Sequence, residues 1–388
     1  MDSSESSTPV RLSVVIPCYN ECNTLERCVQ RVLGIQDGRI DLEIIIVDDG
    51  SQDGSLAVAQ SLAAQHSEIL VLRHAVNQGK GRALRTAFAR VTGDFVAVQD
   101  ADLEYDPHEL KRLLIPLVND DADVVLGSRF LTGGAHRVLY FWHYLGNSVL
   151  TFLSNMFSDL NLTDMETCYK VFRKDALQGM EIEEKGFGVE PELVAKIARM
   201  RLRVYEMGIS YYGRTYEEGK KIRLKDGLRA LYCIFHYNAP TAPLPVQFII
   251  YLFIGGFSAL FNILAFIILF RLFSSLNTAV PTAFLLAATA NYFLCITLLF
   301  RHKARWRSAT EILIYILLVC VAGIVDFCST RILVSVGIVP WASKTIACIL
   351  GLALNFPGRR YLVFPESPAG PWRPQLKSVS GDQARNSP

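Results

Sequence analysis

Short apolar segments alternate with amphipathic ones through the first third of the chain. Five segments rich in β-branched residues predict strands, at Leu12–Ile16, Glu43–Val47, Ile69–Leu72, Phe95–Val98 and Val124–Leu126. Helical periodicity follows between them, over Asn23–Leu33 and in segments that begin near Gln52, Gly79 and Pro107. The second strand (EIIIV) is continuously apolar, as is typical of a strand buried on both faces. Repeated strand–helix–strand units predict an α/β fold with a parallel, doubly wound sheet.

Polar residues follow these predicted strands. They are Tyr19 to Glu21, Asp48 and Asp49, Asp100 to Glu104, and Ser128 with Arg129. In open α/β sheets, ligands bind beyond the carboxyl ends of the strands. We therefore expect these residues to share one edge of the sheet and to form a site there.

The later part of the chain differs, because charged residues almost disappear from it. Between Val246 and Phe300 the only Lys, Arg, Asp or Glu is Arg271. Four apolar segments predict membrane spans, at Val246–Phe270, Leu276–Phe300, Ile312–Val334 and Trp341–Leu362. The first would form a helix about 37 Å long, which is enough to cross a bilayer.

Basic residues near the spans predict their orientation. The loop 301–307 (RHKARWR) holds four Lys/Arg, and Arg359 and Arg360 close the fourth span, whereas the opposite loops offer Arg271 and Lys344. Cytoplasmic loops carry the excess of Lys and Arg, so this count predicts that both termini and the first domain face the cytoplasm. The first ten residues (MDSSESSTPV) lack the apolar run of a signal peptide.

Two amphipathic stretches, Val138–Phe157 and Leu224–Tyr237, mix aromatic residues with few charges. They are either core-facing helices or helices lying at a bilayer surface, and the nearby spans favour the second interpretation. The expected organisation is a disordered N-terminus (1–10), a catalytic domain (11–223), an interface helix and linker (224–243), an all-α membrane domain (244–364) and a disordered tail (365–388).

Composition excludes some classes of protein. Apolar residues make up 51% and charged residues 20%, with 39 Lys+Arg against 37 Asp+Glu, which argues against a disordered or nucleic-acid-coating protein. The nine cysteines are irregularly spaced, and no second Cys/His pair stands at zinc-ligand spacing. Free thiols in a reducing compartment are expected.

The sharpest chemical signal is the sequence Asp100-Ala101-Asp102-Leu103-Glu104, directly after a predicted strand. Three carboxylates suit a hard divalent ion, Mg²⁺ or Mn²⁺, with diphosphate oxygens completing its shell. A chance acidic turn is the alternative. The segment NQGKG (77–81) opens a helix whose amide end and Lys80 are suited to phosphate.

Five motifs stand in order along the first part of the chain: VVIPCYNE, IIVDDGSQDG, NQGKG, QDADLE and GSRF. With them, this part resembles family 2 glycosyltransferases of the A-type, Rossmann-like fold, and among these the dolichol-phosphate mannose synthases and other polyprenyl-phosphate hexose synthases. The apolar part resembles the GtrA-like membrane module of four helices that accompanies some of these enzymes.

The resemblance implies roles in donor binding. The base and ribose would be held by Pro17, Tyr19, Glu21, Asp48 and Asp49, and the metal by Asp100, Asp102 and Glu104. Lys80 and Ala101 would also contact the donor. The segment from Tyr211 to Lys220 resembles a mobile basic loop that closes over the diphosphate, with Arg214 and Lys220 as its contacts.

The resemblance also implies an acceptor site. Arg129 would grip the acceptor phosphate, and Asp102, Arg129 and Arg214 would be the main catalytic residues. Mannose synthases carry a further Arg in the first interface helix. The matching position here is His143, with Asn147 one turn later, and Arg137 is a possible substitute. The segment from Asp164 to Lys170 departs from the family pattern where it is expected to line the sugar pocket.

The expected reaction is the inverting transfer of a hexose from GDP-mannose or UDP-glucose, with mannose favoured, to dolichyl or polyprenyl phosphate at the membrane. A phosphate monoester has a second pKa of about 6 and needs no base to ionise it at neutral pH. Cations and a metal must instead bring two anions together. For a hydroxyl acceptor, Glu190 or Asp164 would serve as the base.

Three alternatives remain open at this point. A processive polysaccharide synthase usually carries a Q-x-x-R-W motif, whereas this chain has Lys303-Ala304-Arg305-Trp306. A carrier of lipid-linked sugars would use the first domain only to bind a nucleotide sugar. A Rossmann dehydrogenase lacks support, because no G-x-G-x-x-G follows the first strand.

Overall fold

A computed structural model describes residues 9–131, 137–138, 140–214, 224–274, 276–300, 308–339, 346 and 356–363. The chain divides into two compact units, one of Met1–Tyr237 with Gly370–Pro388 and one of Asn238–Ala369. The division falls within the segment 224–243, which was expected to be an interface helix and linker. Each unit is described by itself.

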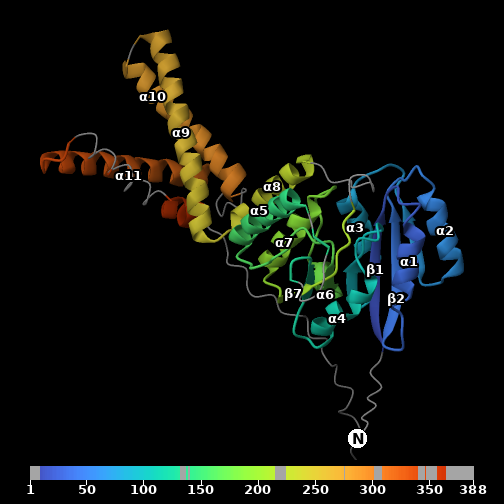
Figure 1. Ribbon diagram of the computed structural model, residues 1–388. Coiled ribbons are helices and arrows are strands. Elements are labelled where there is room, and N and C mark those ends of the chain that lie inside the picture. Colours follow the sequence, from blue (N-terminus) through green and yellow to red (C-terminus); the bar gives the residue numbers. More distant parts are fainter. Residues whose placement is uncertain are drawn as a thin grey trace, which may run out of the picture. The chain divides into compact units, whose positions relative to one another are not determined.

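The first unit is built on a seven-stranded sheet (Figure 1). The strands lie in the order β3-β2-β1-β4-β6-β5-β7. Their bounds are β1 Val10–Cys18, β2 Ile40–Asp48, β3 Ile69–Arg73, β4 Phe95–Val98, β5 Val124–Ser128, β6 Lys170–Arg173 and β7 Val204–Gly208. The five predicted strands are confirmed, and β1 and β2 are longer than predicted.

The prediction of a wholly parallel sheet is wrong, because β6 runs antiparallel to both β4 and β5. Neither β6 nor β7 was predicted. The sequence of β6 (KVFR) is short and has charged residues at both ends, and β7 (VYEMG) has a glutamate near its middle. Such segments give little apolar signal, and only their pairing with neighbouring strands makes them part of the sheet.

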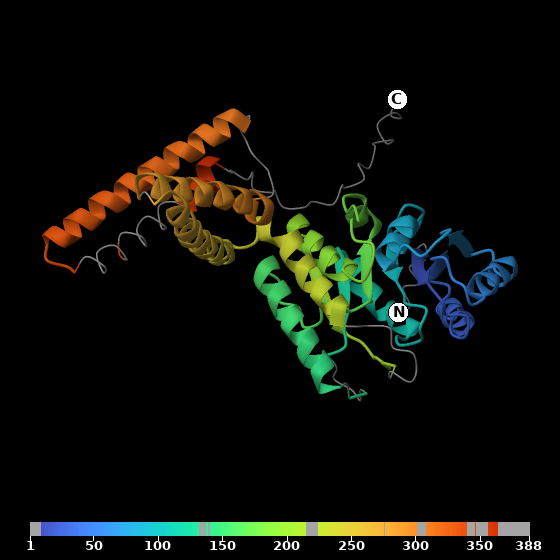
Figure 2. The same ribbon diagram turned by 90° about the horizontal axis from the view of Figure 1, so that it is seen from above.

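Helices cover both faces of the sheet (Figure 1). Their bounds are α1 Leu25–Leu33, α2 Ser55–Gln65, α3 Lys80–Phe88, α4 Leu110–Val118, α5 Phe141–Ser158, α6 Lys174–Gln178, α7 Val189–Met200 and α8 Leu224–Asn238. Helix α2 begins three residues later than predicted, because Gly54 has a φ of 93° and Asp53 accepts the Ser55 amide. Figure 2 shows α5 (green) and α8 (yellow-green) side by side, with the Phe157 and Phe235 rings 4.8 Å apart.

The second unit contains long apolar helices. They are α9 Leu244–Phe273, α10 Leu276–Leu294, which continues as a π-helix over Cys295–Phe300, and α11 Ser308–Ser335. A buried hydrogen bond of 2.9 Å, from Asn291 to Ser258, joins α9 to α10. Among the described residues, α9 alone is both long and apolar enough to cross a membrane. The loop 301–307 and most of the predicted fourth span lie outside the described residues.

Candidate active site

The carboxyl ends of the parallel strands meet at one edge of the sheet. Cys18 at the end of β1 pairs with Asp48 at the end of β2, and Ser128 at the end of β5 pairs with Gly208 at the end of β7. The antiparallel β6 begins at this edge with Lys170. The polar residues that follow these strands are therefore brought together, as expected.

Arg214 joins the acidic segment after β4 to the end of β1. Its Nη2 lies 3.0 Å from an Asp102 oxygen, and its Nε lies 3.2 Å from Glu104. The same guanidinium reaches Glu21 at 3.5 Å. Glu104 also accepts a hydrogen bond of 2.7 Å from the Tyr211 hydroxyl. One arginine is thus the shared counter-ion of three carboxylates from two strand ends.

The ionised form of Asp102 is disfavoured at this point. Burial first, and then repulsion from Asp100 and Glu104, raises the pKa of Asp102 to about 7, although Arg214 acts in the opposite direction. A further cation beside these carboxylates would stabilise the ionised form of Asp102.

A divalent metal ion fits the donor chemistry of this segment. Carboxylate oxygens are the ligands that Mg²⁺ and Mn²⁺ prefer in proteins. In the ranges that the structure describes, however, no three His, Cys, Asp or Glu side chains are gathered closely enough to hold one ion. Asp100, Asp102 and Glu104 are therefore not gathered around one point, and a metal ion here would be held by some of them together with other oxygen ligands.

Two lysines enclose Glu190 beside the acidic segment. The Lys80 ammonium lies 2.9 Å from Asp100 and 3.1 Å from Glu190, and Lys170 contacts the other Glu190 oxygen. Lys170 is fully buried and also donates to two backbone carbonyls of the preceding loop. Burial acts to lower the pKa of Lys80, but Asp100 and Glu190 help to hold that pKa well above its usual value. Lys80 therefore stays charged.

Arg129 is held by a carboxylate from a distant part of the chain. Asp164 accepts hydrogen bonds of 2.6 Å from Nε and 2.7 Å from Nη2 of Arg129. Asn147 of α5 lies against both groups, at 3.4 Å from Arg129 and 3.3 Å from Asp164. These contacts use one edge of the guanidinium, and within the described residues Nη1 makes no hydrogen bond.

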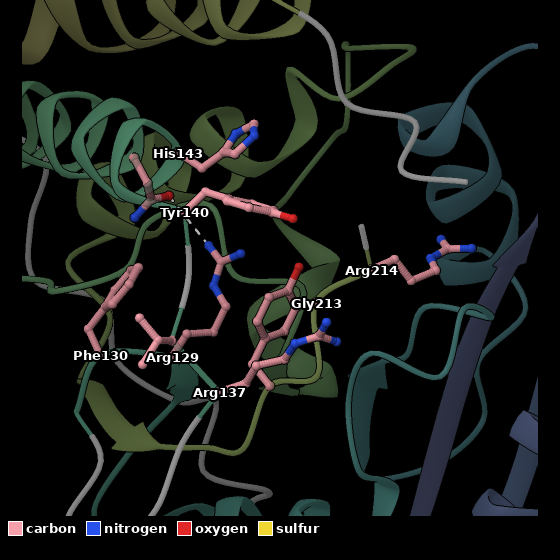
Figure 3. Close-up of a pocket in the computed structure, with 10 residues that line it drawn as sticks. Arg129, Phe130, Arg137, Tyr140, His143, Gly213 and Arg214 are labelled. Atoms are coloured by element: carbon pink, nitrogen blue, oxygen red, sulfur yellow. Dashed lines mark hydrogen bonds between the residues drawn. The ribbon is translucent and has the colours of Figure 1, made fainter. Parts of the chain in front are cut away.

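Arg129 lies at a cavity of about 200 Å³. In Figure 3, Arg129 lies below Tyr140 and His143, which come from the start of α5 and the residue before it, whereas Arg214 points away toward the N-terminal part of the sheet. The cavity brings together all four residues predicted for the acceptor phosphate, and Arg214 from the donor side. Its lining is formed by Arg129, Phe130, Arg137, Val138, Tyr140, His143, Asn147, Tyr211, Gly213 and Arg214.

The two aspartates after β2 have different surroundings. Asp48 is fully buried, and its Oδ1 has no hydrogen-bond partner among the described residues. Both oxygens of Asp49 are already occupied, by the amides of Gln78 (2.9 Å) and Gly79 (2.7 Å) and by Nδ1 of His74 (2.6 Å). The Asp49 carboxylate is therefore occupied by groups of the protein, whereas Oδ1 of Asp48 is an acceptor without a partner among the described residues.

The remaining predicted residues lie at or near the same edge. Pro17 is half-buried in β1, Tyr19 is exposed just beyond it, and Ala101 is buried in the acidic segment. Lys220 lies outside the described residues.

One residue of the site was not predicted. His74 directly follows β3, so the rule that found the other polar residues after strands would also have found it. Lys170 was expected only as the last residue of a segment that lines the sugar pocket, and its contact with Glu190 was not predicted, because β6, which it opens, was not predicted.

Comparison with known proteins identifies both parts of the chain. Residues 13–180 match the family Glycosyl transferase family 2, and residues 250–364 match the GtrA/DPMS transmembrane domain. The chain carries a family 2 glycosyltransferase domain. Its second domain makes this glycosyltransferase a membrane protein, and its α/β sheet agrees with the A-type fold that the sequence motifs implied.

The chain is similar to several known sugar transferases. The dolichol-phosphate mannosyltransferase of Pyrococcus furiosus is 26% identical over 91% of this chain and 98% of that protein. The undecaprenyl-phosphate mannosyltransferase of Micrococcus luteus is 29% identical over 54% of this chain and 87% of that protein. The low-salt glycan biosynthesis hexosyltransferase Agl6 of Haloferax volcanii is 30% identical over 55% of this chain, but the match spans only 51% of Agl6.

Among solved structures, the glucosyl-3-phosphoglycerate synthase of Mycobacterium tuberculosis with Mn²⁺ and UDP-glucose is 20% identical to the glycosyltransferase, with a TM-score of 0.47. The match covers 59% of this chain and 79% of that one.

Proposed function

We propose that this glycosyltransferase moves a hexose from a nucleotide sugar to dolichyl or polyprenyl phosphate. The observation that carries the proposal is the cavity that gathers Arg129, Arg137 and His143 near Arg214. A cavity lined by cationic side chains is suited to an anionic acceptor beside an anionic leaving group. Mannose is favoured over glucose, because two of the relatives are named as mannosyltransferases.

The ion pairs argue for an acceptor that needs no base. Asp164 is bound to Arg129, and Glu190 lies between Lys80 and Lys170. A carboxylate whose oxygens are committed to cations is poorly placed to take a proton from an acceptor hydroxyl. A phosphate monoester, with its second pKa of about 6, arrives largely ionised at neutral pH.

In the proposed reaction, a phosphate oxygen of the acceptor attacks the anomeric carbon of the donor hexose. The bond from that carbon to the diphosphate breaks, its electron pair leaves with the nucleoside diphosphate, and the configuration inverts. Arg129 orients the acceptor phosphate, with Arg137, His143 and Asn147 beside it. Lys80 and Arg214 face the leaving diphosphate, so that charge is neutralised where it develops, and the loop motif assigns Lys220 to the same task. Mg²⁺ or Mn²⁺, held by oxygens drawn from Asp100, Asp102 and Glu104, would supply further neutralisation of the diphosphate.

The nucleoside would lie over the ends of β1 and β2. The unpaired Oδ1 of buried Asp48 is suited to accept a hydrogen bond from the base, because a buried acceptor without a partner destabilises the free protein. Pro17, Tyr19 and Glu21 would line the same region, and Ala101 would lie beneath the donor. The identity of the nucleotide, GDP or UDP, belongs to this proposal.

Exposed aromatic residues support the proposal that the cavity lies at a membrane surface. On α5, Trp142 is 77% and Phe152 is 66% exposed, and on α8 Leu228 and Tyr232 are exposed as well. An apolar face of this kind is typical of helices that lie in the headgroup region of a bilayer. We place this face on the cytoplasmic leaflet, with four spans and both termini in the cytoplasm, on the basis of the basic loop residues.

The test is transfer by the purified full-length protein in detergent. Radiolabelled GDP-mannose and UDP-glucose would each be incubated with undecaprenyl or dolichyl phosphate and Mg²⁺ or Mn²⁺, and the organic phase counted. We expect label in the lipid phase with a wild-type protein, loss of it with EDTA, and none with Asp102→Ala. Binding of nucleotide sugar without any transfer would instead support a carrier, and would overturn the proposal.

A further inference from the structure

A buried histidine lies behind the phosphate-facing loop of the site. His74 follows β3, and its ring contacts two side chains: Nδ1 lies 2.6 Å from Oδ1 of Asp49, and Nε2 lies 2.9 Å from the Thr86 hydroxyl of α3. The backbone amide of His74 also donates to the Asp48 carbonyl at 2.8 Å. The ring therefore links the end of β2 to α3 across the end of β3.

Asp49 transmits this link to the loop before α3. Its Oδ1 accepts the Gln78 amide as well as His74, and its Oδ2 accepts the Gly79 amide at 2.7 Å. A carboxylate with three such donors has one orientation that satisfies all of them. In the contact with Asp49 the ring N–H at Nδ1 donates and the carboxylate accepts, and Nε2 pairs with the Thr86 hydroxyl, which can donate or accept.

The loop is also confined by close backbone contacts. A Cβ on Gly50 (φ +71°) would lie 2.7 Å from the Asn77 amide nitrogen, and a Cβ on Gly79 (φ +96°) would collide with the Lys185 carbonyl oxygen. Both glycines adopt backbone conformations that other residues rarely take. The loop from Val76 to Gly79 is thus enclosed on two sides, and Asp49 sets its position between them.

Lys80 directly follows this loop and depends on it. Its ammonium lies between Asp100 and Glu190, at 2.9 Å and 3.1 Å. A displacement of the Gly79 backbone would move the whole lysine stem, because Lys80 is the next residue. The ammonium would then leave its place beside the acidic segment.

We propose that His74 is a positioning residue for the donor diphosphate: by orienting Asp49 against the amides of Gln78 and Gly79, it sets where the Lys80 ammonium lies. This inference rests on the proposed function, in which Lys80 faces the diphosphate. His74 touches no reacting group, and acts through Asp49 and the loop.

The test compares His74→Leu, which removes the hydrogen bond to Asp49, with His74→Asn, whose amide can donate to Asp49 from the position of Nδ1. With full-length protein, GDP-mannose and undecaprenyl phosphate, we expect His74→Leu to raise the donor KM by about 10-fold to 100-fold. The acceptor KM should change less than the donor KM, and His74→Asn should restore most of the donor KM. His108→Leu, at an exposed histidine outside the site, is the matched control.

A purely structural role would lower the activity without separating the two KM values, or would leave Leu and Asn equally defective, and either result would overturn the proposal. Thr86→Val is a milder second variant if His74→Leu does not fold, and it should raise the donor KM in the same direction. Calorimetric binding of GDP or UDP provides a separate readout. If the wild type binds nucleotide but transfers no sugar, the proposed function fails, while weaker nucleotide binding by His74→Leu would still support the positioning role.

Discussion

Arg129 has part of its hydrogen-bonding capacity committed and part unused. Asp164 occupies Nε and Nη2, so the guanidinium is fixed in direction while Nη1 remains at the cavity. Fixing an arginine before the ligand arrives lowers the entropy lost on binding. Asp164 therefore orients Arg129, and its oxygens are poorly placed to remove a proton from an acceptor hydroxyl.

Arg129→Lys tests this geometry. A lysine cannot donate twice to Asp164 and still face the cavity, so we expect the KM for undecaprenyl phosphate to rise by about 10-fold or more. The donor KM should stay within about twofold, since the proposed reaction assigns Arg129 to the acceptor. Steady-state kinetics with each substrate varied in turn would measure both, with Arg112→Lys at an exposed position as the control. An equal change in both KM values would contradict the assignment to the acceptor.

The raised pKa of Glu166 predicts that the stability of the protein depends on pH. Burial, and then repulsion from Glu190, raise its pKa to about 7 from an ordinary 4.5, and its Oε1 has no hydrogen-bond partner in the described part of the chain. Because the folded-state pKa is the higher one, this group favours folding at low pH, and that contribution is lost as the pH rises through about 7.

Glu166→Gln keeps the shape and removes the titration. At pH 8 we expect the unfolding free energy of this variant to exceed that of the wild type by about 1–3 kcal/mol, so that the variant melts at a higher temperature. At pH 5 the two proteins should differ little in stability. Differential scanning fluorimetry in detergent at both pH values would show it. A difference independent of pH would mean that the ionised form of Glu166 is not destabilising.

At the scale of elements, α5 has two distinct roles. Its first turns supply His143 and Asn147 to the cavity, while its other face carries exposed aromatic residues. Phe157, near its end, is buried against Phe235 of α8. The helix is therefore anchored at one end and apolar toward the solvent, which suits an element that guides a lipid chain to the phosphate site.

Trp142→Ser and Phe152→Ser test this role. Each removes apolar area that would otherwise be covered by lipid, so we expect the KM for undecaprenyl phosphate to rise about threefold to tenfold. A short, water-soluble prenyl phosphate should be used as well as before, because its phosphate contacts are unchanged. Ile115→Ser, at an exposed apolar position of α4, provides the control. Equal losses with the long and the short acceptor would argue against a lipid-facing role.

At the scale of the whole molecule, the chain combines two units with different environments. The described side chains named for donor and acceptor all lie in the unit that ends at Tyr237, and α9 to α11 belong to the other. The Asn291–Ser258 hydrogen bond helps to fix how α9 packs against α10. In lipid the hydrophobic effect cannot drive this packing, because lipid is as apolar as the helices themselves.

Removal of residues 244–388 tests whether the first unit suffices for chemistry. We expect the shortened protein to transfer hexose to detergent-dispersed acceptor but to sediment poorly with membranes, because its described donor and acceptor residues remain. The same fragment with Asp102→Ala measures the background. A folded fragment that transfers nothing, with detergent and lipid supplied, would show that the membrane unit helps to build the site.

The sequence by itself determined the five strands of the alternating pattern, the apolar second domain and the region of the site. It could do so because parallel strands bring their carboxyl ends to one edge, whatever the details of packing. Motif order along the chain was also enough to predict a family 2 glycosyltransferase, which the family comparison confirms. The roles of the individual site residues stay predictions.

Only the tertiary structure decided which of those residues pair. Arg214 contacts Glu21 and Asp102, Asp164 contacts Arg129, and Asp49 binds His74 and two loop amides. These partners are far apart in the sequence, and they meet because of the strand order and the antiparallel entry of β6. Strand order depends on long-range packing that local periodicity does not encode, so the sequence could predict the place of the site but not its ion pairs.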